Sequence, residues 1–133
     1  MPQSRAAGHY LCSELVRVSF RTVRGETRHV VGNLEEICAE RAVVLLDAPV
    51  SPQTNLWLGA RGRRFGAVVE SCVHDPLLGY LLSLRFAGRY RWNPADFEPA
   101  HMLRVRDASP TAKAAAYCGT ACRRARLGTE PRP

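Results

Sequence analysis

Two groups of residues in this chain have side chains that suit the binding of a phosphorylated ligand. The first is Arg17-Val-Ser-Phe-Arg21, with two guanidinium groups four positions apart. The second is Glu36-Ile-Cys38-Ala-Glu-Arg41, which joins a carboxylate, a thiol and a third guanidinium. Arginine binds phosphate by donating hydrogen bonds from two parallel N–H groups. Two or three arginines are enough for a nucleotide-phosphate site. These residues are therefore the candidate ligand contacts.

The residues needed for catalysis or for a metal site do not occur in a suitable pattern. The sequence has no glycine-flanked serine elbow, no phosphate-cradling glycine loop ahead of a helix, and no His/Asp/Glu set at metal spacing. Five widely spaced cysteines do not make a disulfide framework, and Cys118 and Cys122 alone make a poor zinc site. We predict a protein that is not an enzyme and has no metal or cofactor.

Charge and hydropathy place the chain among cytoplasmic proteins with an anionic partner. The formal net charge is +7, and all but one of the basic residues are arginine. The arginines are dispersed, which favours a solvated basic surface over a face that binds duplex nucleic acid. No apolar run is long enough to span a membrane, and the first residues lack the pattern of a signal peptide.

The elements that must position the candidate contacts are short strands. Apolar and polar residues alternate, with turn residues between the alternating segments, at the spacing of a small antiparallel barrel or sandwich. Trp57 alternates within one of these segments, so we expect it to pack in the core or at its rim. The expected strands cover residues 14–23, 27–36, 42–46, 54–58, 64–73 and 80–86.

The segment Gly32–Val50 has conflicting local preferences. Asn33 and Glu36 have the spacing of a helix N-cap and its partner. However, the β-branched run that begins at Val43 favours a strand, and tertiary context can override helix propensity. We predict a strand that ends near Glu36, a turn over residues 38–41 and a new strand from Ala42.

The last third of the chain changes in character. Asn93-Pro94 is a cap followed by a proline, which predicts one helical turn near residues 94–98, with Trp92 and Phe97 packed against the barrel. We divide the chain into a flexible lead-in (1–13), a barrel domain (14–106) and a flexible basic tail (107–133). Residues 110–128 of the tail can form a short helix.

The order of these segments resembles that of a PilZ domain. The resemblance covers roughly residues 12–103: the R-x-x-x-R of Arg17 and Arg21, the segment from Glu36 to Arg41 in place of [D/N]-x-S-x-x-G, an apolar strand, a proline-containing loop, and Ser83-Leu-Arg-Phe86. It implies an all-β, six-stranded antiparallel PilZ-like β-barrel with a short C-terminal helical segment. It also implies a bacterial signalling module that binds cyclic di-GMP.

The resemblance assigns roles to individual residues. Arg17 and Arg21 would contact the phosphates, and Glu36, Cys38 and Arg41 would surround a guanine. Three of these residues depart from the family pattern: Glu36 replaces Asp or Asn, Cys38 replaces Ser, and Arg41 replaces Gly. Arg17 and Arg21 also lie within one predicted strand, roughly 13 Å apart, so they cannot chelate a single phosphate together.

Three hypotheses for function remain open at this point. The first is cyclic di-GMP binding, on the basis of the motif layout and the positive charge. The second is a barrel that has lost the nucleotide and acts through protein–protein contact, on the basis of the departures at Cys38 and Arg41. The third is weak, nonspecific nucleic-acid binding, which would fall steeply with salt.

Overall fold

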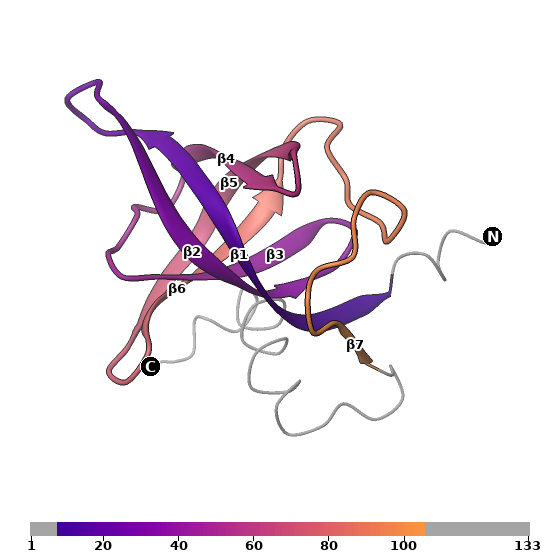
Figure 1. Ribbon diagram of the computed structural model, residues 1–133. Helices are drawn as coiled ribbons and strands as arrows, with labels where there is room; N and C mark the ends of the chain where they lie inside the picture. The colour runs from indigo at the N-terminus through magenta and orange to yellow at the C-terminus, as the bar shows by residue number, and fades with distance from the viewer. Residues whose placement is uncertain (1–7, 106–133) are drawn as a thin grey trace.

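The strands form one antiparallel sheet that closes on itself as a six-stranded β-barrel (Figure 1). The computed structural model describes residues 8–105. The sheet order is β2-β3-β6-β5-β4-β1, and β1 also pairs with β2, which closes the barrel. The strands are β1 (His9–Arg21), β2 (Thr27–Ile37), β3 (Arg41–Leu46), β4 (Asn55–Ala60), β5 (Arg63–Asp75), β6 (Gly79–Phe86) and β7 (Leu103–Val105).

The predicted all-β, six-stranded antiparallel barrel is confirmed. The sequence patterns did not reveal β7, a three-residue strand that pairs with the start of β1. The described part of the chain contains no helix, and hence none long and apolar enough to cross a bilayer.

The ambiguous segment after Gly32 is a strand, a turn and a strand, as predicted. β2 ends at Ile37 and β3 begins at Arg41, and the Cys38 N–H donates to the Arg41 carbonyl at 2.9 Å to close the turn. Pairing of β2 with β1 and β3 overrides the local helix preference, because it satisfies the backbone groups while the apolar side chains are buried.

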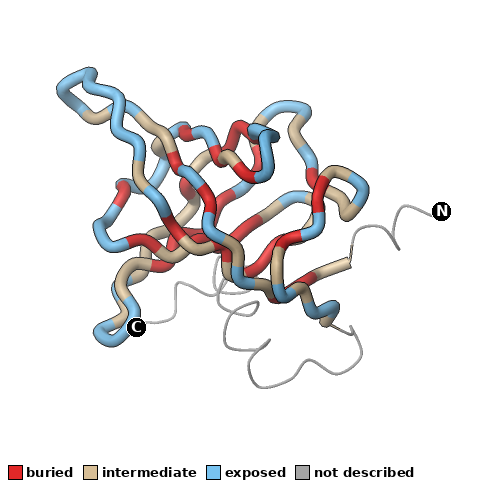
Figure 2. Tube along the Cα trace, viewed as in Figure 1, coloured by how far each residue is buried: buried red, intermediate tan, exposed pale blue. Residues whose placement is uncertain are grey.

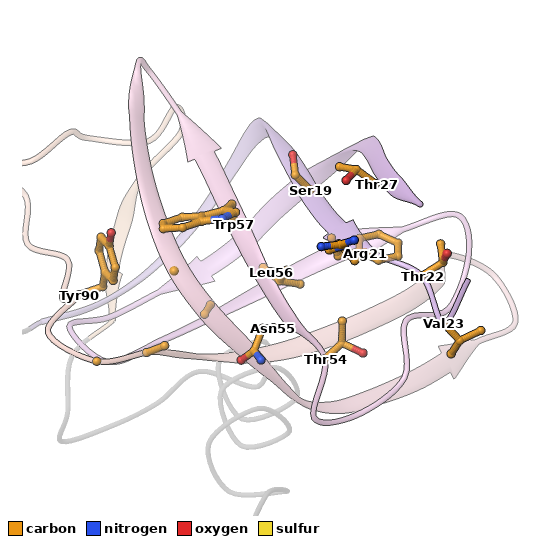
Figure 3. A pocket seen from close by; sticks show the side chains of 15 residues that line it. Ser19, Arg21, Thr22, Val23, Thr27, Thr54, Asn55, Leu56, Trp57 and Tyr90 are labelled. Atoms are coloured by element: carbon orange, nitrogen blue, oxygen red, sulfur yellow. The ribbon is translucent and has the colours of Figure 1, made fainter. Parts of the chain in front are cut away.

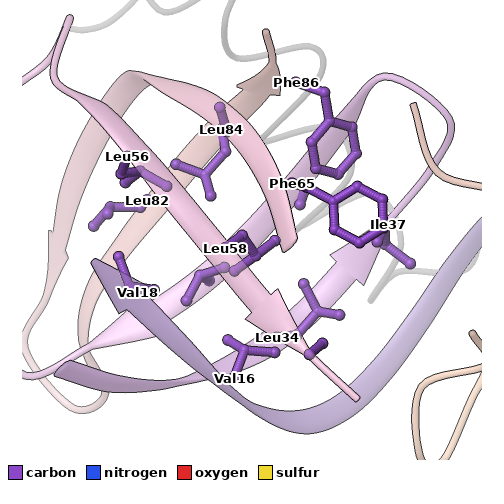
Figure 4. Close-up of a cluster of buried hydrophobic side chains, with 14 of the residues drawn as sticks. Val16, Val18, Leu34, Ile37, Leu56, Leu58, Phe65, Leu82, Leu84 and Phe86 are labelled. Carbon is purple, nitrogen blue, oxygen red and sulfur yellow. The ribbon is translucent and has the colours of Figure 1, made fainter. Parts of the chain in front are cut away.

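The barrel interior is filled by the inward-facing apolar side chains of every barrel strand (Figure 4). In β1, for example, Val16 and Val18 are buried while Arg17 between them is exposed, which is the period-two alternation of a half-buried strand. Figure 2 shows this as buried segments along the barrel walls and exposed hairpin tips. Residues in this core include Val16, Val18, Leu34, Ile37, Val44, Leu56, Leu58, Phe65, Val69, Leu82, Leu84 and Phe86.

The segment after β6 packs against the barrel, as predicted. Trp92 is 1% exposed, its Nε1–H donates to the Phe97 carbonyl at 3.1 Å, and its ring stands edge-on to Tyr10 with centroids 5.5 Å apart. The Trp92 N–H also donates to the Ala39 carbonyl at 3.0 Å. These contacts fix the loop to the β2–β3 turn without regular structure.

The structure corrects two boundaries. β1 begins at His9 and not at residue 14, because Tyr10 pairs with both Ile37 of β2 and Arg104 of β7. The helical turn expected near residues 94–98 is only a hydrogen-bonded turn at 94–96, where the Asn93 side chain accepts the Ala95 N–H at 2.7 Å. Residues 107–133, with the expected short helix and both tail cysteines, lie outside the described residues.

At Gly32, β2 passes close to β3. A Cβ at this position would lie 2.9 Å from the Leu45 carbonyl oxygen and 2.5 Å from a Leu46 methyl carbon. By contrast, a Cβ at Gly59 of β4 would meet nothing nearer than 3.8 Å. Only the first glycine is therefore required by packing.

We predict that Gly32→Ala lowers the free energy of unfolding by about 1–3 kcal/mol, because the added methyl group collides with backbone that cannot move freely. Gly59→Ala is the matched control and should change stability by less than about 1 kcal/mol. Urea unfolding followed by tryptophan fluorescence measures both. Equal stability of the two variants would contradict the close approach at Gly32.

Candidate functional site

Arg17 and Arg21 lie on the outer face of the barrel, where their side chains alternate with the buried ones of β1. The strand register places Arg17, Gly59 and Arg64 in one row across β1, β4 and β5, and Ser19, Trp57 and Gly66 in the next. We call this surface the Trp57 face. It consists of Arg17, Ser19, Arg21, Asn55, Trp57, Gly59, Arg64, Gly66 and Val68.

Trp57 is at the centre of this face and remains 36% exposed. The Arg64 guanidinium lies 4.1 Å above its ring, and Tyr90 stands perpendicular to it with centroids 5.7 Å apart. A side chain at Gly66 would come within 3.1 Å of the Tyr90 ring, so this glycine makes room for the tyrosine. Of the two expected positions for Trp57, core or rim, the structure excludes the core, because its inward-facing neighbours Leu56 and Leu58 take that place.

Two hollows lie along the Trp57 face, and Trp57 itself lines the first of them. One of about 800 Å³ runs from Tyr90 and Trp57 along β4 to Arg21 at the end of β1 (Figure 3). The other, of about 720 Å³, contains Arg17 and Arg64. Both volumes are in the range of small-molecule sites, about 300–1,000 Å³. Arg17 and Arg21 line different hollows but share one face, with the Trp57 row between them.

The charge on the Trp57 face has one sign. None of its nine positions is acidic, and within residues 8–105 no carboxylate forms a salt bridge with Arg17, Arg21 or Arg64. The neighbouring arginines differ, since Arg61 is paired with Glu14 and Arg63 with Asp96. The face therefore presents cations that carboxylates of this domain do not neutralise.

Glu36 lies in a different part of the molecule. It pairs with Leu11, six residues before Arg17 and hence roughly 20 Å away along β1. The residue is only 1% exposed, and its Oε1 is 2.8 Å from the His9 Nε2. The hollow beside Glu36 and Cys38 has a volume of only about 10 Å³, which cannot hold a nucleobase.

Arg41 is also engaged in contacts within the domain. Its Nε and Nη2 donate to the two carboxylate oxygens of Glu70 at 3.2 and 3.3 Å. Arg85 donates to the same carboxylate at 3.2 Å, so Glu70 links β3, β5 and β6. Cys38 contributes its backbone N–H to the turn before β3.

The five residues predicted as ligand contacts therefore fall into two groups that do not line one hollow. Arg17 and Arg21 are on the Trp57 face, whereas Glu36, Cys38 and Arg41 surround the β2–β3 turn. Their roles as ligand contacts remain predictions. The sequence interpretation missed Trp57, Arg64 and Tyr90 as members of a site. The alternation of Trp57 with two buried leucines was the signal that indicated an outward tryptophan.

The described cysteines are free thiols in partly buried positions. The Cys12 Sγ–H donates to the Leu34 carbonyl at 3.6 Å, and burial raises the pKa of this thiol to about 12. It therefore stays protonated at neutral pH and is a poor nucleophile. Within residues 8–105, no three His, Cys, Asp or Glu side chains are grouped so that they could hold a metal ion.

Comparisons with known proteins add no identification. No family model, curated protein or solved structure matches this chain. The similarity to PilZ domains therefore rests on the sequence motifs alone.

The His9–Glu36 pair makes stability depend on pH. Burial raises the pKa of Glu36, and the opposing hydrogen bond and charge of His9 do not cancel this effect. Burial lowers the pKa of His9, but the hydrogen bond and charge of Glu36 outweigh it, so the net shift is upward. Both groups hold protons more tightly in the folded state than in the unfolded chain, so stability falls as pH rises.

We predict that the free energy of unfolding decreases from pH 5 to pH 8. This range lies above the ordinary pKa of Glu36, 4.5, and spans the ordinary pKa of His9, 6.5. Each unit of upward shift is worth about 1.4 kcal/mol over this range. Glu36→Gln should flatten the dependence, because the variant removes the buried acid. Val23→Ala, which changes an exposed residue without an ionisable group, is the control and should keep the slope. Urea unfolding at several pH values measures the slope, and an unchanged slope in Glu36→Gln would refute this account.

Proposed function

We propose that this protein is a signalling module that binds a cyclic dinucleotide, with cyclic di-GMP as the first candidate, on the Trp57 face. The single observation that carries the proposal is a half-exposed tryptophan between Arg17 and Arg21, on a surface without carboxylates. A cyclic dinucleotide has planar bases that stack on an aromatic ring and two phosphates that accept N–H groups from arginine.

The spacing of the arginines agrees with a ligand that carries two anionic groups. Arg17 and Arg21 are roughly 13 Å apart along β1, too far to hold one phosphate, but they lie on either side of the row that contains Trp57. Arg64 already lies over the Trp57 ring, and its guanidinium can move aside or stack on the opposite face of a bound base. Tyr90 limits the hollow at the far end.

In this proposal Arg17 and Arg21 keep the role that the resemblance gives them, and Trp57 takes the place of the second motif. Glu36, Cys38 and Arg41 then serve the β2–β3 turn. The two arrangements can be separated by experiment, because Trp57 and Cys38 line different hollows.

We expect isothermal titration with cyclic di-GMP to give measurable heat, and Trp57→Ala to weaken binding by about tenfold or more, since base stacking on an aromatic ring is worth about 1–3 kcal/mol. The double variant Arg17→Ala, Arg21→Ala should abolish binding. Arg24→Ala, in the exposed β1–β2 turn, is the matched control and should bind normally.

Two outcomes would contradict this proposal. Loss of binding in Cys38→Ala, with normal binding in Trp57→Ala, would place the ligand at the β2–β3 turn. Absence of heat at high micromolar ligand would exclude nucleotide binding and favour the protein–protein alternative.

Single-stranded nucleic acid is a second candidate, because an exposed tryptophan among arginines is also the composition of a stacking platform for successive bases. We expect a fluorescent oligothymidine to bind at low salt and to be released as salt increases, since phosphate contacts release counterions. Anisotropy measured for wild type and Trp57→Ala tests this. Equal binding of the two proteins would exclude the Trp57 face as the platform.

A further inference from the structure

The first half of β2 has an open edge. β2 pairs with β1 along its length, but its pairing with β3 starts only at Asn33. In the part of the chain that the structure describes, no strand pairs with the other side of residues 27–32. Figure 1 shows the reason: the β1–β2 hairpin projects beyond the barrel, past the strand that would cover it.

The register shows which backbone groups face this edge. The Thr22 N–H donates to the Glu26 carbonyl at 2.8 Å, and hydrogen-bonded pairs alternate from that point along an antiparallel ladder. The N–H and C=O groups of Thr27, His29 and Val31 therefore point away from β1. From Asn33 onward, the same side of β2 forms hydrogen bonds with β3. The open edge is therefore the continuation of a strand edge that pairs with a partner in its second half.

Few of the usual protections of an exposed edge occur here. Natural edges carry proline, lysine, a bulge or a covering loop. Residues 27–32 contain no proline or lysine, and their register with β1 is unbroken. Arg28 is the only residue of the six with a permanent charge. Such an edge can accept a further strand through main-chain hydrogen bonds.

A groove runs beside the open edge. It has a volume of about 620 Å³ and lies between the β1–β2 hairpin and the loop that follows β3. Its walls include the apolar side chains of Phe20, Val30, Leu46 and Val50. An extended peptide along β2 would send every second side chain into this groove and leave the others in solvent.

The charges around the groove favour an acidic partner. Arg21 and Arg28 line it against a single carboxylate, that of Asp47. Neither arginine forms a salt bridge within residues 8–105. A second copy of this chain fits less well, because edge-to-edge pairing of two hairpins would bring these arginines together.

We propose that the open edge of β2 binds an extended acidic peptide segment of a partner protein by strand addition. Thr27, His29 and Val31 form the main-chain hydrogen bonds, and Arg28 contacts the acidic side chains. Trp57 does not line this groove, although Arg21 lines both it and the hollow beside Trp57, and the proposal does not depend on nucleotide binding.

The experiment uses the full chain and two capped hexapeptides, one of alternating valine and glutamate and the other of alternating valine and lysine. Amide hydrogen exchange followed by NMR is the measurement. We expect the glutamate peptide to slow exchange at Thr27, His29 and Val31 by about tenfold or more, with little change at Arg28 and Val30, whose N–H groups already bond to β1. The lysine peptide should have no effect.

Two variants at one position separate strand addition from contact through side chains. Val31→Pro removes an edge N–H without breaking the ladder with β1, and should weaken binding of the glutamate peptide roughly tenfold. Val31→Ala keeps the N–H and should bind within about threefold of wild type. Circular dichroism checks that both variants fold.

Several results would overturn the proposal. These are equal binding of the two peptides, equal binding by the two Val31 variants, or no change at the edge amides with millimolar glutamate peptide. Protection of the edge amides that rises with protein concentration, without peptide, would show that the occupant is a second copy. Because Trp57→Ala leaves the edge intact, it should bind the peptide normally, so failure of nucleotide binding and of peptide binding can be told apart.

Discussion

The double pairing of β1 is the interaction on which the rest of this structure depends. β1 forms hydrogen bonds with β2 on one side and with β4 on the other, and this converts a six-stranded sheet into a closed barrel. Closure satisfies backbone groups that would otherwise form two long edges. It also fixes which side chains face the core, since a shift of one residue would exchange Val16 and Val18 with their polar neighbours.

The same register creates the outer surface. Once Val18 points inward, Arg17 and Ser19 must point outward, and the rows across β4 and β5 bring Trp57 and Arg64 beside them. Trp57 and Arg64 are both distant from Arg17 and Ser19 in the sequence. The positive surface is thus a consequence of barrel closure. Nearby carboxylates lie outside the face and pair with other arginines, such as Arg61, so they do not neutralise the charge of the face.

Closure is incomplete at one place, and the physical reason is strand length. β2 has eleven residues and β3 has six, so β3 covers only the second half of β2. Gly32 marks the transition, since β3 passes too close there for any side chain. The uncovered half continues as a hairpin arm, which leaves the edge of β2 and the groove next to it accessible.

The amino-acid sequence by itself determined the class of this fold, because period-two alternation and turn residues are local properties that do not depend on distant partners. It was sufficient to place six strands and the turn over residues 38–41. Only the tertiary structure decided which residues share a site. Glu36 meets His9 across 27 residues, and Arg17 is separated from Glu36 by about half the length of β1, because pairing between strands sets these distances and spacing along the chain does not.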